Sequence, residues 1–106
     1  MSTPESRIKT KVTKYLRAER IWYFFPAANG FGRAGIPDII AIVRGQFIGI
    51  ECKADCTKKP TKLQQQCGQQ IKQAGGEWFL VCDDKTLEEV KHYVSGRESE
   101  SISSQT

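Results

Sequence analysis

The sequence predicts an α/β fold in which helices flank a mixed four-stranded sheet. Hydrophobic residues recur at helical spacing in three segments and gather into strand-like runs in four others. These segments follow the order helix, three strands, helix, strand, helix. A helix that links the third strand to the fourth is the usual crossover of a parallel pair, whereas a short connection between the second and third strands favours an antiparallel hairpin.

The length and composition fit one small domain. With 106 residues the chain can bury a modest core, and dimerisation would be a natural source of further buried surface. The formal charge of +4 suits a polyanionic partner without identifying one. No apolar run approaches the roughly 18 residues of a membrane span, and nothing at the N-terminus resembles a signal peptide. We therefore expect a cytoplasmic protein with no membrane partner.

The cysteines argue against a zinc site. They show no C-x-x-C pairing, and the single histidine, His92, is well separated from them in sequence. In a reducing compartment free thiols are the default. We therefore expect free thiols at all four positions, which are Cys52, Cys56, Cys67 and Cys82.

The first helix is predicted from Thr3 to about Arg20. Thr3 offers a capping hydroxyl, Pro4 suits the first helical position, and Glu5 is an acid in the first turn. The inward apolar stripe of this helix comprises Ile8, Val12, Tyr15 and Leu16. A second face carries the basic residues Arg7, Lys11 and Lys14. This basic face is either a solvated surface or a contact for a nucleic-acid backbone.

The next segments predict three strands. Residues 21–26 are rich in strand formers and end at a proline, so they form a short first strand. Its aromatic residues, Trp22 to Phe25, suit the core or a dimer interface better than a base-stacking platform. Residues 27–35 contain three glycines and form a loop, whose Arg33 either contacts a phosphate or is exposed without a role. The second and third strands, residues 35–43 and 46–53, flank Arg44 and Gly45.

The second half of the chain predicts a helix, a strand and a helix. Thr61 and Gln64 have the spacing of a capping box, and two glycines at 75 and 76 supply a stop. The apolar stripe of this helix comprises Leu63, Cys67, Ile71 and Ala74. Residues 78–82 are almost continuously apolar, as in a strand covered on both faces. Asp84 is expected to cap a last helix with Leu87, Val90 and Val94 inward.

The C-terminal residues predict a tail. Residues 96–106 contain one apolar residue and much serine, a composition typical of disorder. We therefore expect a single domain over residues 1–95 and a disordered polar tail over residues 96–106.

The proposed hairpin brings two acidic residues together. If Arg44 and Gly45 are its two loop residues, facing residues have numbers that sum to 89, and Asp38 faces Glu51. Facing Cβ atoms are only about 4.5 to 5.5 Å apart, so the two charges repel. A divalent cation would remove the conflict, because hard ions take carboxylate oxygens as ligands. Lys53 lies on the same face by strand alternation. A three-residue loop would shift the register and turn Asp38 away.

These residues carry a family resemblance. Gly35-Ile36-Pro37-Asp38 followed by Glu51-Cys52-Lys53 resembles the PD-(D/E)xK nuclease superfamily, and within it the VRR-NUC domains. The likeness covers roughly residues 5–94. Four further elements in the right order support it, namely Glu5 in the first helix, Asn29 to Arg33 before the proline, Thr61 to Gln64 after the lysine, and Gly75-Gly76 before a strand.

The resemblance implies a restriction-endonuclease-like αβββαβ core and a magnesium- or manganese-dependent endonuclease. Asp38, Glu51 and the backbone carbonyl of Cys52 would bind the metal, and Lys53 would position or activate the attacking water. Glu5, as a possible further ligand, and Gln64 match family positions near the site. Small free-standing members, typical of phages and prophages, resemble homodimers that cut branched DNA, including four-way junctions.

Two other functions stay open. A nuclease of the same fold could act on flaps, nicks, ends or foreign DNA. Alternatively, the chain could be a non-catalytic DNA-binding or dimerisation module, and an intact set of Asp38, Glu51 and Lys53 argues against that.

Overall fold

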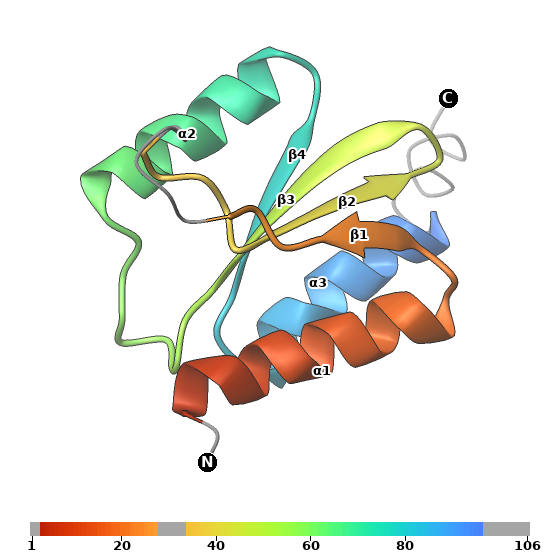
Figure 1. Cartoon of the computed structure of the whole chain (residues 1–106), viewed down its shortest axis with the longest axis horizontal. Helices are drawn as coiled ribbons and strands as arrows, with labels where there is room; N and C mark the ends of the chain where they lie inside the picture. The colour runs from red at the N-terminus through yellow and green to blue at the C-terminus, as the bar shows by residue number, and fades with distance from the viewer. Residues whose placement is uncertain (1–2, 28–33, 97–106) are drawn as a thin grey trace, which may run out of the picture.

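A computed structural model describes residues 3–27 and 34–96 of the protein. Within this part, three helices and four strands alternate in the expected order (Figure 1). The elements are α1 (Pro4–Ala18), β1 (Trp22–Phe24), β2 (Ile39–Val43), β3 (Gln46–Cys52), α2 (Lys62–Gln73), β4 (Glu77–Val81) and α3 (Asp84–Ser95). Arg33 and the expected disordered tail beyond Gly96 lie outside the described residues.

The strands form one mixed four-stranded sheet, as the sequence predicted, and the structure gives its strand order as β1-β2-β3-β4. β2 is antiparallel to both β1 and β3, and β4 is parallel to β3 because α2 provides the crossover. Val43 pairs with Gln46, so Arg44 and Gly45 are the two loop residues. Both have positive φ, 50° and 79°, as a type I′ turn requires. The facing residues Ile39 and Ile50 confirm the register whose numbers sum to 89.

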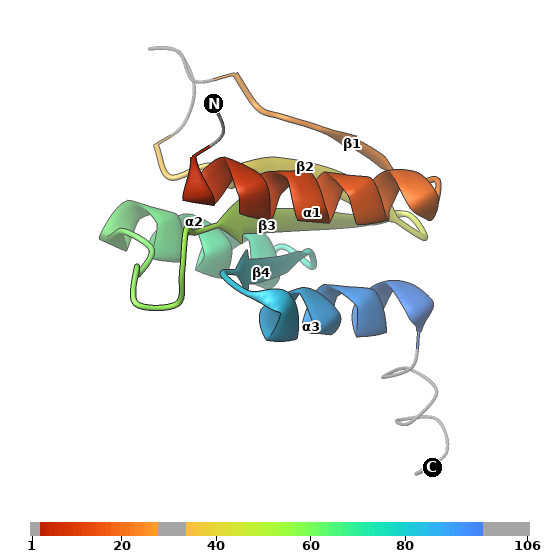
Figure 2. The ribbon, with the colours of Figure 1, turned by 90° about the horizontal axis from the view of Figure 1, so that it is seen from below.

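The helices cover both faces of the sheet. Figure 2 views the molecule from the side of α1 and α3 and shows these two helices side by side in front of the strands. Their apolar stripes and one face of the sheet form the main core, while α2 packs on the opposite face (Figure 1). The buried residues of this core are Ile8, Val12, Leu16, Ile39, Ala41, Val43, Ile48, Ile50, Cys52, Val81, Leu87 and Val90.

Helix α1 is shorter than predicted. Thr3 caps it through a hydrogen bond from the Ser6 amide, and the helix ends at Ala18 rather than at Arg20. Arg20 has a φ of 58°, a left-handed conformation that cannot continue a helix. The turn directs the chain into β1.

Helix α2 buries less of its stripe than expected. Thr61 and Gln64 form the predicted capping box, and Gly75 follows the helix with a φ of 99°. However, Leu63 is 53% exposed, because the face that meets the sheet is centred on Cys67 and Gly68. A Cβ at Gly68 would lie 2.6 Å from the Trp78 ring, so glycine allows the helix to approach β4 closely.

Two expectations for the C-terminal elements are corrected. β4 was expected to be covered on both faces, but apart from Val81 its residues are only half-buried. Although α2 and α3 both contact β4, it is an edge strand of the sheet. Asp83, not Asp84, caps α3, because its side chain accepts the Thr86 amide while the Thr86 hydroxyl accepts the Asp83 amide. Leu87 and Val90 are buried as predicted, and Val94 packs partly buried against the core.

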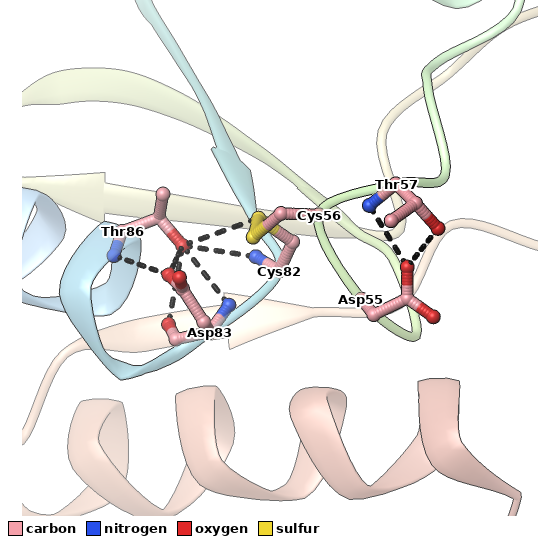
Figure 3. The surroundings of a disulfide bond; sticks show 6 residues. All are labelled: Asp55, Cys56, Thr57, Cys82, Asp83 and Thr86. Carbon is pink, nitrogen blue, oxygen red and sulfur yellow. Dashed lines mark hydrogen bonds between the residues drawn. A yellow bond between two sulfur atoms is a disulfide. The ribbon is translucent and has the colours of Figure 1, made fainter.

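The expectation of four free thiols is wrong for two of them. Cys56 and Cys82 form a disulfide (Figure 3). Cys52 and Cys67 are free and buried. The bond joins the loop after β3 to the residue that follows β4. These two strands are parallel neighbours, so the chain leaves both at the same end of the sheet. In the part of the chain that the structure describes, no helix has the length and apolar character needed to cross a membrane.

We predict that the disulfide stabilises the fold. Its cysteines are 26 residues apart, and closing a loop of that length stabilises a protein by about 3 kcal/mol through the entropy of the unfolded chain. Urea unfolding should show this loss both in the Cys56→Ser/Cys82→Ser variant and in the wild type under reductant. The variant itself should not respond to reductant. A wild type equally stable with and without reductant would contradict the prediction.

Candidate functional site

The hairpin places Asp38 beside Glu51, as the sequence predicted. Asp38 immediately precedes β2, and its neighbour Ile39 pairs with Ile50, the neighbour of Glu51. One carboxylate oxygen of Asp38, Oδ2, accepts the Cys52 amide hydrogen at 2.8 Å. This bond fixes the Asp38 side chain against the end of β3.

Glu51 is the most unusual side chain of the site. It is only 2% exposed, and Oε1 has no hydrogen-bond partner among the described residues. Burial, followed by the nearby charge of Asp38, raises the pKa of Glu51 to about 7 against the opposing effect of Lys53. A buried polar atom without a partner costs free energy, so the surrounding fold must hold Glu51 Oε1 in this position.

Lys53 supplies the positive charge next to Glu51. Its Nζ lies 3.4 Å from Glu51 Oε2, and the side chain is 14% exposed. The Lys53 backbone amide donates to the Val81 carbonyl at 3.0 Å, which extends the β3–β4 pairing by one residue. Lys53 is therefore anchored by its backbone while its ammonium partly neutralises the buried carboxylate.

Cys52 contributes through its backbone. Its side chain belongs to the core on the other face of the sheet, and its amide holds Asp38. Burial, followed by the charges of Asp38 and Glu51, raises the pKa of the thiol to about 12, so it stays protonated at neutral pH. The role of its carbonyl as a metal ligand stays a prediction.

Lys9 is a further residue of the site, which the sequence alone did not indicate. Its Nζ lies 3.7 Å from Glu5 Oε2 and 3.6 Å from Asp38 Oδ1, so it joins α1 to the start of β2. The spacing of Glu5 and Lys9 indicates a pair on one helix face. Only the packing of α1 against the sheet shows that Asp38 is the second partner.

The other predicted site residues differ in their placement. The Gln64 side-chain oxygen accepts the Thr61 amide at 2.8 Å, so it serves the cap of α2. Arg7 and Lys14 are exposed on α1, and the exposed Lys11 forms a 3.0 Å ion pair with Asp84 on α3. No interaction described in the structure connects these four residues to Asp38 or Glu51.

A groove adjoins Asp38. Its volume is about 1250 Å³, and Lys9 and Asp38 lie in its wall together with apolar residues of the sheet and of α2. Gly35 lets the chain pass close to α2, since it has a φ of 79° and a Cβ there would lie 2.3 Å from the Leu63 carbonyl oxygen. The groove thus opens an apolar surface next to the charged groups.

Among the described residues, two groups of side chains offer candidate metal ligands. Cys56, Cys82 and Asp83 have ligand atoms within 4.8 Å of one another, but their sulfur atoms are bonded to each other in the disulfide. Asp38 and Glu51 form the second group, whose two adjacent carboxylates and buried oxygen without a partner suit a hard divalent cation. Within the described residues, Glu5 does not complete a three-carboxylate cluster of the same 4.8 Å compactness.

We predict that the Glu51 carboxylate destabilises the metal-free fold as the pH rises. Its pKa is about 7 in the folded protein against 4.5 for the ordinary group, so its contribution to stability is fully present below pH 4.5 and is lost as the pH passes 7. The loss amounts to about 3 kcal/mol. Urea unfolding in EDTA at pH 5 and pH 8 should show the wild type losing this amount relative to Glu51→Gln.

The exposed Glu89 provides the control for this measurement. Glu89→Gln makes the same change in charge and should keep the pH dependence of the wild type. If Glu51→Gln and the wild type lose stability in parallel, the carboxylate does not carry the effect.

Comparison with known proteins identifies the fold family. No protein-family model matches the chain, and no curated protein matches it either. A solved structure described as a VRR_NUC domain does match, with a TM-score of 0.76 and 26% sequence identity. The match covers 87% of this chain and 99% of that structure. It agrees with the mixed four-stranded sheet and flanking helices of the restriction-endonuclease-like fold. The chain therefore has the fold of a VRR-NUC domain.

Proposed function

We propose that the protein is a magnesium- or manganese-dependent endodeoxyribonuclease that acts as a homodimer on branched DNA, in particular on four-way junctions. The observation that carries this proposal is the pair of adjacent carboxylates, Asp38 and Glu51, with Lys53 3.4 Å from Glu51. Such an enzyme would act on DNA in the cytoplasm of a bacterial cell or of a phage-infected host.

The donor set fits a divalent metal. Glu51 Oε1 is buried and has no partner among the described residues, so a cation there would satisfy it. Asp38, Glu51 and the Cys52 carbonyl would hold the metal, with Glu5 as a further possible ligand. A bound metal lowers the pKa of water and stabilises negative charge on the phosphate.

The chain's own groups have distinct parts in phosphodiester hydrolysis. Lys53 would donate a hydrogen bond to the attacking water and place positive charge beside the scissile phosphate. Asp38 is oriented for its role by the Cys52 amide. Glu51 must lose its proton to act as a ligand, which its pKa of about 7 allows at slightly alkaline pH. Gln64 stays a candidate from the resemblance alone, since its described contact is the helix cap.

A basic surface would bind the DNA backbone. The chain carries a formal charge of +4, and Arg7 and Lys14 are exposed on α1, the helix that supplies Lys9 to the site. We assign phosphate contacts to Arg7, Lys11 and Lys14, and to Arg33, which precedes β2 in the sequence. Lys11 would have to leave Asp84 to make such a contact.

An exposed apolar surface supports a homodimer. Trp22 pairs with Ile42, which pairs with Phe47, so these three residues form a row across β1, β2 and β3. All three are exposed, Trp22 by 63%. Phe24 lies on the same face and is also exposed. Apolar surface of this kind marks contacts with other molecules, and a second copy would bring the two-fold symmetry that paired cuts require.

The alternatives are less well supported. A nuclease of this fold that acts on flaps, ends or foreign DNA would use the same carboxylates and differ in the shape of the DNA it accepts. A non-catalytic DNA-binding module would have no reason to keep a buried carboxylate without a hydrogen-bond partner at Glu51 Oε1.

Cleavage of a four-way junction tests the proposal. With magnesium the wild type should introduce paired symmetric nicks, and EDTA should abolish them. Asp38→Asn removes a carboxylate ligand and should reduce the rate at least about 100-fold. Glu89→Gln, an exposed change in charge, should cut as the wild type does. Cleavage confined to flaps or free ends would favour the first alternative, and equal inertness of the wild type and Asp38→Asn on all these substrates would favour the second.

Lys53→Ala should separate binding from cutting. Because the ammonium acts at the transition state, the variant should bind the junction with an affinity within about threefold of the wild type but cut it roughly 100 to 1000 times more slowly. Fluorescence anisotropy in calcium measures binding, and a single-turnover assay in magnesium measures cutting. Circular dichroism checks that the variant is folded. An equal loss of binding and cutting would show that Lys53 serves to hold DNA instead.

A further inference from the structure

Lys9 contacts two carboxylates on different elements. Its ammonium lies 3.7 Å from Glu5, one turn earlier on α1, and 3.6 Å from Asp38 at the start of β2. The Asp38 oxygen that it contacts is Oδ1, whereas Oδ2 is already bonded to the Cys52 amide. Lys9 therefore uses the Asp38 oxygen that the backbone leaves available.

A metal and Lys9 would compete for this oxygen. Asp38 Oδ2 accepts a hydrogen bond at 2.8 Å, so Oδ1 is the oxygen with more freedom to bind a cation. Lys9 already places a positive charge there. The Lys9 ammonium contacts Glu5 and Asp38, and both carboxylates are candidate metal ligands. A divalent cation that binds them must weaken or break the contacts of Lys9.

Lys9 is better suited to such a release than Lys53. The Lys53 side chain is 14% exposed, and its backbone is held in the β3–β4 pairing. The Lys9 side chain is 34% exposed and lines the groove beside Asp38. Its long side chain can turn into the groove while α1 stays packed through Ile8 and Val12.

We propose that Lys9 is a positioning residue that holds Glu5 and Asp38 as their counterion in the metal-free protein, is displaced when a divalent cation binds, and then contacts a DNA phosphate. The proposal rests on the proposed function, because it requires the metal site at Asp38 and Glu51. This exchange of partners by Lys9 would couple metal binding and DNA binding, so that each strengthens the other. The metal frees an ammonium for DNA, and by thermodynamic reciprocity DNA strengthens metal binding.

Metal affinity without DNA gives the first test. Calcium is titrated into metal-free protein by calorimetry, with thermal unfolding as a second readout. Lys9→Met removes the competing charge and keeps the length of the side chain, so it should bind calcium about three- to tenfold more tightly than the wild type. It should also show the larger rise in Tm on calcium addition. Lys72→Met, at an exposed position in the last turn of α2, makes the same change in charge and should match the wild type.

Coupling to DNA gives the second test. Calcium should tighten junction binding by the wild type more than by Lys9→Met, because only the wild type gains a released ammonium. In magnesium, Lys9→Met should raise KM for the junction more than it lowers kcat, since Lys9 contacts the DNA backbone rather than the reacting atoms.

The outcomes separate this proposal from the one on which it rests. If the wild type binds calcium in a manner that depends on Asp38 but Lys9→Met binds it equally or more weakly, the displacement of Lys9 is wrong while the metal site stands. Equal strengthening of DNA binding by calcium in both proteins would also overturn it. If neither protein binds calcium, the metal site itself is wrong and both proposals fail.

Discussion

The burial of the Glu51 carboxylate next to Asp38 is the constraint on which the rest of the site depends. A two-residue turn sets the register of β2 and β3, and that register leaves Glu51 no freedom to move away from Asp38. Lys53 offsets part of the repulsion, yet the pKa of Glu51 is still raised to about 7. The fold thus holds two carboxylates in an unfavourable arrangement that a bound cation would relieve. Such a conflict within an otherwise well-packed domain is typical of a functional site.

The two faces of the sheet have different roles, because one packs in the main core and the other carries the candidate site. One face joins α1 and α3 in the main core, and this core supplies the rigidity that keeps Glu51 in place. The other face carries Glu51 by strand alternation and is covered by α2 only in part, so the row of Trp22, Ile42 and Phe47 across β1, β2 and β3 remains exposed. Charged groups and apolar surface therefore lie on one side of a rigid platform. A DNA-cutting dimer would need both features together.

The site is locally acidic within a basic chain. Three carboxylates, on Glu5, Asp38 and Glu51, face two ammonium groups, on Lys9 and Lys53. The whole chain nevertheless carries a formal charge of +4. An acidic site concentrates cations and would repel DNA if left unneutralised, whereas the basic surroundings attract the DNA backbone. Neutralisation of the site is therefore a requirement for close approach of a phosphate.

The sequence by itself determined what depends on short range along the chain. The positive φ of Arg44 and Gly45, the pairing of β2 with β3 and the capping box at Thr61 all follow from residues a few positions apart, so the juxtaposition of Asp38 and Glu51 was predictable. The mixed sheet followed from the order of the elements, because a helical crossover between β3 and β4 makes a parallel pair.

Only the tertiary structure decided what depends on how distant elements pack. Lys9 meets Asp38 because of the angle at which α1 lies on the sheet, which no spacing in the sequence specifies. Cys56 finds Cys82 because two parallel strands end side by side, although 26 residues separate the cysteines. The partial exposure of β4 and of Leu63 likewise reflects where the sheet stops and which face of α2 meets it. Local propensity and periodicity determine the elements, whereas contacts between them depend on the relative placement of surfaces far apart in the chain.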